Sequence, residues 1–62
     1  MQEIKGFSPI TFVDEGQLVW IQVGSDLVRC EVKQAMGRTA RVVNTSRGID
    51  TWVGTDELRI RN

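Results

Sequence analysis

The chain has 62 residues, with eight Lys and Arg, eight Asp and Glu, no His and one Cys. This length allows one domain, near the lower limit at which a chain folds alone. One Cys excludes an internal disulfide and, without His, argues against a zinc site. We therefore expect no metal and no cofactor, and a fold stabilised by packing, by a homo-oligomer or by a larger complex.

The charge is balanced overall but unevenly distributed. Residues 1–28 hold one basic and four acidic side chains, whereas residues 29–62 hold seven basic and four acidic ones. A local basic face is compatible with this excess, although a strong polyanion-binding signature requires a more basic domain. The N-terminus lacks the apolar region of a signal peptide, and no apolar run approaches the ~20 residues of a membrane helix. We expect a soluble cytoplasmic protein without a membrane partner.

Residues 1–15 leave two interpretations open, an N-terminal arm or a short edge strand entered through Pro9. From residue 16 onward, strand patterns alternate with Gly-containing turns. The expected strands are residues 18–23, 27–33, 39–44, 49–53 and 58–61. A short 3₁₀ turn is expected over residues 54–57, with Thr55 as its cap.

Alternation assigns one face of each strand to the core. The side chains expected to point inward are Val19, Ile21, Val23, Val28, Cys30, Val32, Ala40, Val42, Ile49, Val53, Leu58 and Ile60. Five short strands joined by tight turns predict an all-β fold, a small meander that closes into a five-stranded barrel over residues 16–62. Closure also removes exposed sheet edges.

The same alternation places two Trp and several basic residues on the outer face. Simple hairpins give one row of Leu18, Lys33, Arg41 and Trp52, and a second row of Trp20, Glu31, Val43 and Asp50, with a register uncertain by two residues. The candidate binding residues are Trp20, Arg29, Lys33, Arg38, Arg41, Trp52 and Arg59. Lys33 beside Arg41 suggests an anion site, and Arg41 beside Trp52 a cation–π pair.

A purely structural interpretation of this face stays open. Exposed Lys and Arg keep strands soluble, and Phe7 or Phe12 can cover Trp20. Catalysis is not expected, because the chain has no His and Cys30 points inward without a basic partner. No phosphate-binding glycine loop is present.

The segments Gly16-x-x-Val19-Trp20, Arg29-x-x-Val32 and Trp52-Val53 followed by Leu58-Arg59 resemble the SH3-like C-terminal domain of retroelement integrases. The resemblance covers residues 16–61, and the same skeleton is similar to Tudor domains. It implies an SH3-like barrel that binds DNA and makes multimer contacts, using Arg29, Arg41, Arg59 and the surface of the two Trp residues.

Three departures from these families limit what is carried over. The Trp-x-Gly-Pro segment and the His of the integrase pattern are absent, and without Tyr a Tudor aromatic cage is not available.

Residues 52–62 are similar in spacing to the plasmid-encoded type II dihydrofolate reductases, which are tetramers around a shared pore. Their Val-Gln-x-Tyr-Pro active-site stretch is missing here.

Two functional hypotheses therefore remain close, and a third is distant. The first is a nucleic-acid-binding module in which Arg contacts phosphates and Trp stacks on bases. The second is a protein-interaction module, of a regulatory or inhibitory kind found in phages and mobile elements, that uses the same face. The third is an oligomeric enzyme with a pore site.

Overall fold

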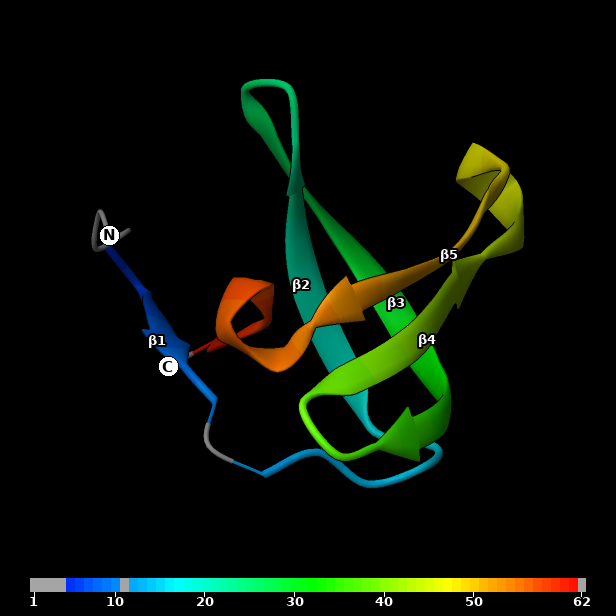
Figure 1. Ribbon diagram of the computed structural model, residues 1–62. Coiled ribbons are helices and arrows are strands. Elements are labelled where there is room, and N and C mark those ends of the chain that lie inside the picture. The colour runs from blue at the N-terminus through cyan, green and yellow to red at the C-terminus, as the bar shows by residue number, and fades with distance from the viewer. Residues whose placement is uncertain (1–4, 11, 62) are drawn as a thin grey trace.

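Six antiparallel strands form one sheet in the computed structural model, which describes residues 5–10 and 12–61 (Figure 1). The strands are β1 (Phe7–Pro9), β2 (Leu18–Val23), β3 (Asp26–Met36), β4 (Thr39–Asn44), β5 (Ile49–Gly54) and β6 (Arg59–Arg61). Two 3₁₀ turns, η1 (Thr45–Arg47) and η2 (Thr55–Glu57), flank β5. The expected all-β class is confirmed, and no helical segment of the described residues has the length and hydropathy to cross a membrane.

The number of strands and the edges of the sheet differ from the expectation. The strand order is β1-β6-β2-β3-β4-β5, so there are six strands rather than five. The additional strand is β1, which pairs with β6 through Phe7 opposite Arg61 and Pro9 opposite Arg59. The pairing leaves β1 and β5 as the two edges of an open sheet, and the expected closure into a barrel stays a prediction.

The core follows the predicted alternation in the central strands. Its buried residues are Val19, Ile21, Val28, Cys30, Val32, Ala40, Val42 and Leu58. Ile49 and Val53 of β5 are half-buried and pack against this cluster. The middle of each strand from β2 to β4 thus buries every second residue, which is the periodicity of a sheet that is covered on one face.

Two predicted core residues, Val23 and Ile60, are exposed instead. Val23 is 41% exposed, because the turn between β2 and β3 projects beyond the remaining strands (Figure 1). Ile60 is 36% exposed and lies opposite Ser8 of the three-residue strand β1, near the end of the sheet. Alternation gives the direction of a side chain, but burial also requires something to cover it.

A β-bulge in β3 resets the alternation at Lys33. Val32 pairs with Val42, and the next pair is Gln34 with Arg41, which leaves Lys33 as the extra residue. Without this bulge Gln34 would point into the core. With it, Gln34 stays exposed and Ala35 becomes half-buried opposite Ala40. The bulge therefore keeps an amide out of the core and extends β3 three residues beyond the predicted end.

The β2–β3 register is shifted by two residues from the predicted rows. Leu18 lies opposite Glu31, and Trp20 lies opposite Arg29. The shift preserves which face each side chain occupies, because strand side chains repeat every two residues. The predicted pairings Arg41 with Trp52 and Val43 with Asp50 are confirmed.

Specific caps hold the two ends of β5. The Asn44 side chain accepts a hydrogen bond from the Arg47 N–H (3.1 Å), and Gly48 adopts a left-handed conformation (φ 67°) that ends η1. Gly54, not the predicted Thr55, occupies the N-cap position of η2. Its N–H donates to Glu57 Oε2 (3.1 Å), so a side chain within the turn replaces the expected hydroxyl cap.

Alanine substitutions at the buried Leu58 and at the exposed Ile60 test which of the two side chains belongs to the core. We expect Leu58→Ala to lower the free energy of unfolding by about 2–5 kcal/mol, because it leaves a cavity at a fully buried site. Ile60→Ala is the matched control and should cost less than about 1 kcal/mol, since its side chain is partly in water already. Urea unfolding followed by Trp fluorescence measures both values. Equal costs would contradict the assignment of Ile60 to the surface.

Candidate functional site

The outward-facing side chains of β2–β5 form the candidate site, which we call the outer face. It comprises Leu18, Trp20, Arg29, Glu31, Lys33, Arg41, Val43, Asp50 and Trp52. Strand register brings these residues together in rows, such as Leu18, Glu31, Val43 and Asp50. Five of the seven predicted site residues belong to this face, while Arg38 lies in the β3–β4 turn and Arg59 in β6.

Arg41 and Asp50 form a bidentate ion pair on this face. Arg41 Nε donates to Asp50 Oδ1 (2.7 Å) and Nη2 to Oδ2 (2.6 Å). These hydrogen bonds raise the pKa of Arg41 and lower the pKa of Asp50 from its ordinary value of 3.8. The guanidinium is therefore oriented toward a carboxylate rather than toward the ring of Trp52, the expected cation–π partner.

Lys33 is also next to a carboxylate. Its Nζ lies 3.3 Å from Glu31 Oε2, two residues earlier on the same strand. Because Lys33 occupies the bulge, Gln34 rather than Lys33 lies opposite Arg41. The two cations that suggested an anion site each face an acid of the outer face, which lowers the local positive potential.

The two Trp residues have different environments. Trp20 is half-buried, and Phe7 of β1 packs against it in an edge-on arrangement with ring centroids 5.3 Å apart. This contact was one of the two coverings considered for Trp20, while the other candidate, Phe12, is 84% exposed. Trp52 is 47% exposed and is the aromatic ring most available to a ligand on the outer face.

Arg59 does not belong to an exposed binding surface, which corrects the sequence assignment. Its residue is only 8% exposed, and it lies between Trp20 of β2 and Pro9 of β1 in the sheet. Its Nη1 donates to the carbonyl oxygens of Asp56 (2.7 Å) and Leu58 (2.8 Å). The edge-strand interpretation of residues 1–15 thus agrees with β1, which pairs with β6, and the guanidinium stabilises the chain around η2 instead of facing solvent.

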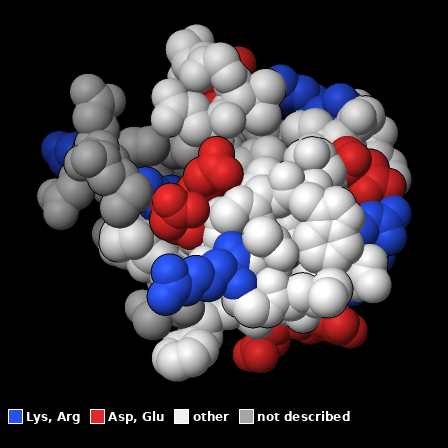
Figure 2. Space-filling view, viewed as in Figure 1, with Lys and Arg blue, Asp and Glu red and all other residues white. Residues whose placement is uncertain are grey.

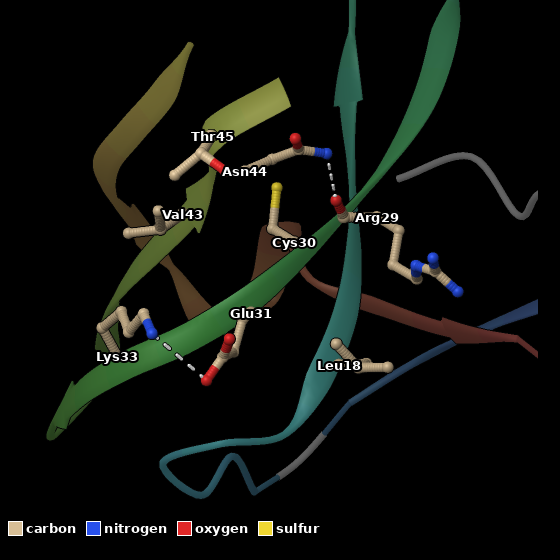
Figure 3. Close-up of a pocket in the computed structure, with 8 residues that line it drawn as sticks. All are labelled: Leu18, Arg29, Cys30, Glu31, Lys33, Val43, Asn44 and Thr45. Carbon is tan, nitrogen blue, oxygen red and sulfur yellow. Dashed lines mark hydrogen bonds and ion pairs between the residues drawn. The ribbon is translucent and has the colours of Figure 1, made fainter. Parts of the chain in front are cut away.

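Arg29 and Arg38 are exposed but lie apart. Arg29 is opposite Trp20, and Figure 3 shows its side chain directed across β2, away from Lys33 and Val43. The exposed Arg38 follows the glycine of the β3–β4 turn, and its carbonyl accepts a hydrogen bond from the Thr55 N–H (2.8 Å). The predicted cations therefore do not converge on one point.

A hollow of about 310 Å³ lies over β3 and β4 (Figure 3). Its lining residues are Leu18, Arg29, Cys30, Glu31, Lys33, Val43, Asn44 and Thr45. Leu18 is 55% exposed and Val43 half-buried, so both contribute apolar surface beside the Lys33–Glu31 pair. Sequence reasoning placed Leu18 and Val43 on this face but did not select them as binding residues. Exposed apolar residues at outward positions are the signal that identifies them.

Cys30 is a core residue, as predicted. It is 2% exposed, and its Sγ lies 3.8 Å from the carbonyl oxygen of Val28. Burial raises the pKa of this thiol, which lowers its reactivity as a nucleophile. Within the described residues no group of three His, Cys, Asp or Glu side chains is placed to hold a metal ion.

Acidic and basic side chains are interspersed on the surface seen in Figure 2, with apolar and neutral atoms between them. No continuous area of one charge covers this view. Long-range attraction of a polyanion requires such an area, whereas a mixed surface favours a partner with matching local charges.

The pKa of Asp50 reports directly on its ion pair. Arg41→Ala should raise this pKa toward 3.8, and Arg41→Lys should raise it less, because Lys keeps the charge but loses the bidentate geometry. The pKa of Asp50 is lower in the folded than in the unfolded state. The stabilisation of the fold by the ion pair is therefore complete above pH 3.8 and is lost as the pH falls through the pKa of the folded state. Carboxyl ¹³C NMR titration measures the shift, with Arg47→Ala as the control. An unchanged pKa in Arg41→Ala would contradict the pair.

Comparison with known proteins identifies no relative of this chain: no protein-family model, curated protein or solved structure matches it. The features of the molecule that bear on its function are the outer face, its half-exposed Trp52 and the pairing of its charges.

Proposed function

We propose that this chain is a non-catalytic interaction module that binds a protein partner through the outer face of β4 and β5. The observation that carries the proposal is the position of Trp52, which is half exposed beside the Arg41–Asp50 ion pair. Trp and Arg are the residue types that most often dominate protein interfaces. An Arg already held by a carboxylate loses little side-chain entropy when a partner binds.

Apolar neighbours extend this contact area across the sheet. Val43 lies diagonal to Trp52 on the adjacent strand, and Leu18 lies in the same row as Val43 beyond Glu31. Glu31 separates Leu18 from Val43, so these apolar residues alternate with the charged groups of the Arg41–Asp50 and Lys33–Glu31 pairs. A surface that mixes apolar and charged side chains in this way is typical of a non-obligate protein interface.

The finer fold assignment, an SH3-like barrel that is only partly closed and leaves β5 at an edge, is part of the same proposal. It is supported by the strand order, in which the C-terminal β6 pairs with β2, and by the 3₁₀ turn η2 directly before β6. It is further supported by the resemblance of residues 16–61 to SH3-like domains described above. We place the module inside the cell, where its lone thiol stays reduced.

Nucleic acid is the second candidate ligand, favoured by one specific observation. Arg29, Arg38 and Arg47 are exposed and make no ion pair among the described residues. Three uncompensated cations on separate elements suit contacts with spaced phosphates. Each phosphate contact of this kind would make the slope of the logarithm of the binding constant against the logarithm of the salt concentration steeper by about one.

Site-specific photocrosslinking tests the protein-binding proposal. A photoreactive aromatic residue at position 52 should capture a specific protein from a cell extract, whereas the same residue at position 23 should not. Val23 is the matched control, because it is also a partly exposed apolar residue but lies at the projecting β2–β3 turn. With the captured protein purified, Trp52→Ala should weaken binding about 30-fold, the loss typical of an interface hot spot. Equal binding by Trp52→Ala would contradict the proposal.

Fluorescence titration separates the two candidates. In a Trp20→Phe variant the emission comes from Trp52 alone. We expect single- and double-stranded oligonucleotides to leave this emission unchanged at low salt, because the neighbouring cations are already paired. Saturable quenching that weakens as salt rises would instead support the nucleic-acid module. In that case Arg29→Ala and Arg38→Ala should each make the affinity for the oligonucleotide less dependent on salt concentration.

A further inference from the structure

Strand β5 is an edge of the sheet that lacks two features that often protect an edge, short length and proline. It is six residues long, contains no Pro and no Lys, and pairs with β4 in an unbroken register. Asp50, Thr51 and Trp52 at its centre are all exposed. The opposite edge, β1, has three residues and ends in Pro9. Short length and proline protect β1 from pairing with another chain, whereas β5 has neither.

Two hydrogen bonds show which backbone groups point to the free edge of β5. The Thr55 N–H donates to the carbonyl of Arg38, the residue directly before β4, whereas the Gly54 N–H donates to the Glu57 side chain in η2. Successive N–H groups point in opposite directions along a strand. The N–H and C=O groups of Asp50 and Trp52 therefore point away from β4, and the Glu57 carboxylate already occupies the outward N–H of Gly54.

We propose that β5 pairs antiparallel with β5 of a second copy of this chain, with Thr51 opposite Thr51 on a two-fold axis. Residues that face each other across such an axis lie on the same side of the sheet. This register places Asp50 opposite Trp52 of the second copy, so that the outward backbone groups form about four hydrogen bonds. Centring the axis on Trp52 would instead require the N–H of Gly54, which is occupied.

The side chains of this register complement their own copies. Ile49 of each copy lies opposite Val53 of the other, which gives two such pairs. Both residues are half-buried on the core side of the sheet. Thr51 meets Thr51, a favourable cross-strand pair. Trp52 lies beside the Asp50 of the second copy, whose charge is already balanced by Arg41. With a formal net charge of zero, two copies also approach without long-range repulsion.

The small size of the chain favours a second copy as the occupant of this edge. A domain of 62 residues buries little apolar surface, and pairing is one of the ways in which such chains gain stability. The dimer continues the sheet across two chains and places the two outer faces side by side. The inference does not rest on the proposed function, since it depends on backbone groups of the edge rather than on a partner of the outer face.

Charge substitution at Thr51 tests the register in the full chain. Thr51 is exposed, so Lys or Glu at this position should leave the fold intact, as checked by circular dichroism. In sedimentation equilibrium we expect the unmodified protein to dimerise, and Thr51→Lys and Thr51→Glu each to weaken dimerisation about tenfold, because like charges then face each other. An equimolar mixture of the two variants should regain the affinity as a heterodimer. A mixture that stays as weak as its components would overturn the register.

Proline at position 50 tests the role of the backbone edge. Asp50→Pro removes an outward N–H without breaking the β4 ladder, whereas Asp50→Ala keeps that N–H and removes the same side chain. We expect Asp50→Ala to dimerise and Asp50→Pro to be monomeric. Equal dimerisation of both variants, or an unmodified protein that is monomeric up to about 1 mM, would overturn the proposal. In the latter case the edge would be free for a strand of another protein.

Discussion

The bulge at Lys33 in β3 is the feature on which the arrangement of the sheet depends. β3 is the longest strand and pairs with β2 on one side and β4 on the other, so any error in its alternation affects both neighbours. A strictly alternating β3 would place Gln34 in the core, where its amide would need hydrogen-bonding partners. By adding one residue, the bulge allows Ala35 to face Ala40 and keeps the far end of β3 in register with β4.

The bulge also affects the charges of the outer face. It places Gln34 rather than Lys33 opposite Arg41. Lys33 pairs with Glu31, and Arg41 with Asp50. Exposed ion pairs of this kind contribute little to stability, because both charges are well solvated when separated. Their effect is on recognition: they leave a nearly neutral face whose exposed apolar groups, above all Trp52, are the main anchors available to a partner.

The small core explains why the edges of this sheet matter. Its eight buried residues are four Val, one Ile, one Leu, one Cys and one Ala, and none is aromatic. Both Trp side chains lie on the outward side instead, one packed against Phe7 and the other half exposed. A core of this size stabilises a single chain only modestly. Pairing of β5 with a second copy would add hydrogen bonds and apolar contacts where the chain has an open strand.

The sequence by itself determined the all-β class, the positions of the central strands and the inward face of β2, β3 and β4. These features depend on alternation along a strand, which is a local property. The pairings Arg41 with Trp52 and Val43 with Asp50 were also predictable, because a single tight turn connects β4 to β5. The inward position of Cys30 followed from the same pattern.

Only the tertiary structure decided which outward residues are free to bind. Arg59 has an outward position in the sequence pattern, yet β1 and Trp20 lie on either side of it and its guanidinium bonds to carbonyl groups around η2. Ile60 and Val23 have inward positions, yet they lie where no other element covers them. The Arg41–Asp50 contact joins diagonal neighbours on two strands, which alternation within one strand does not reveal. Burial and charge pairing depend on neighbours that are distant in sequence, and their positions are set only when the sheet assembles.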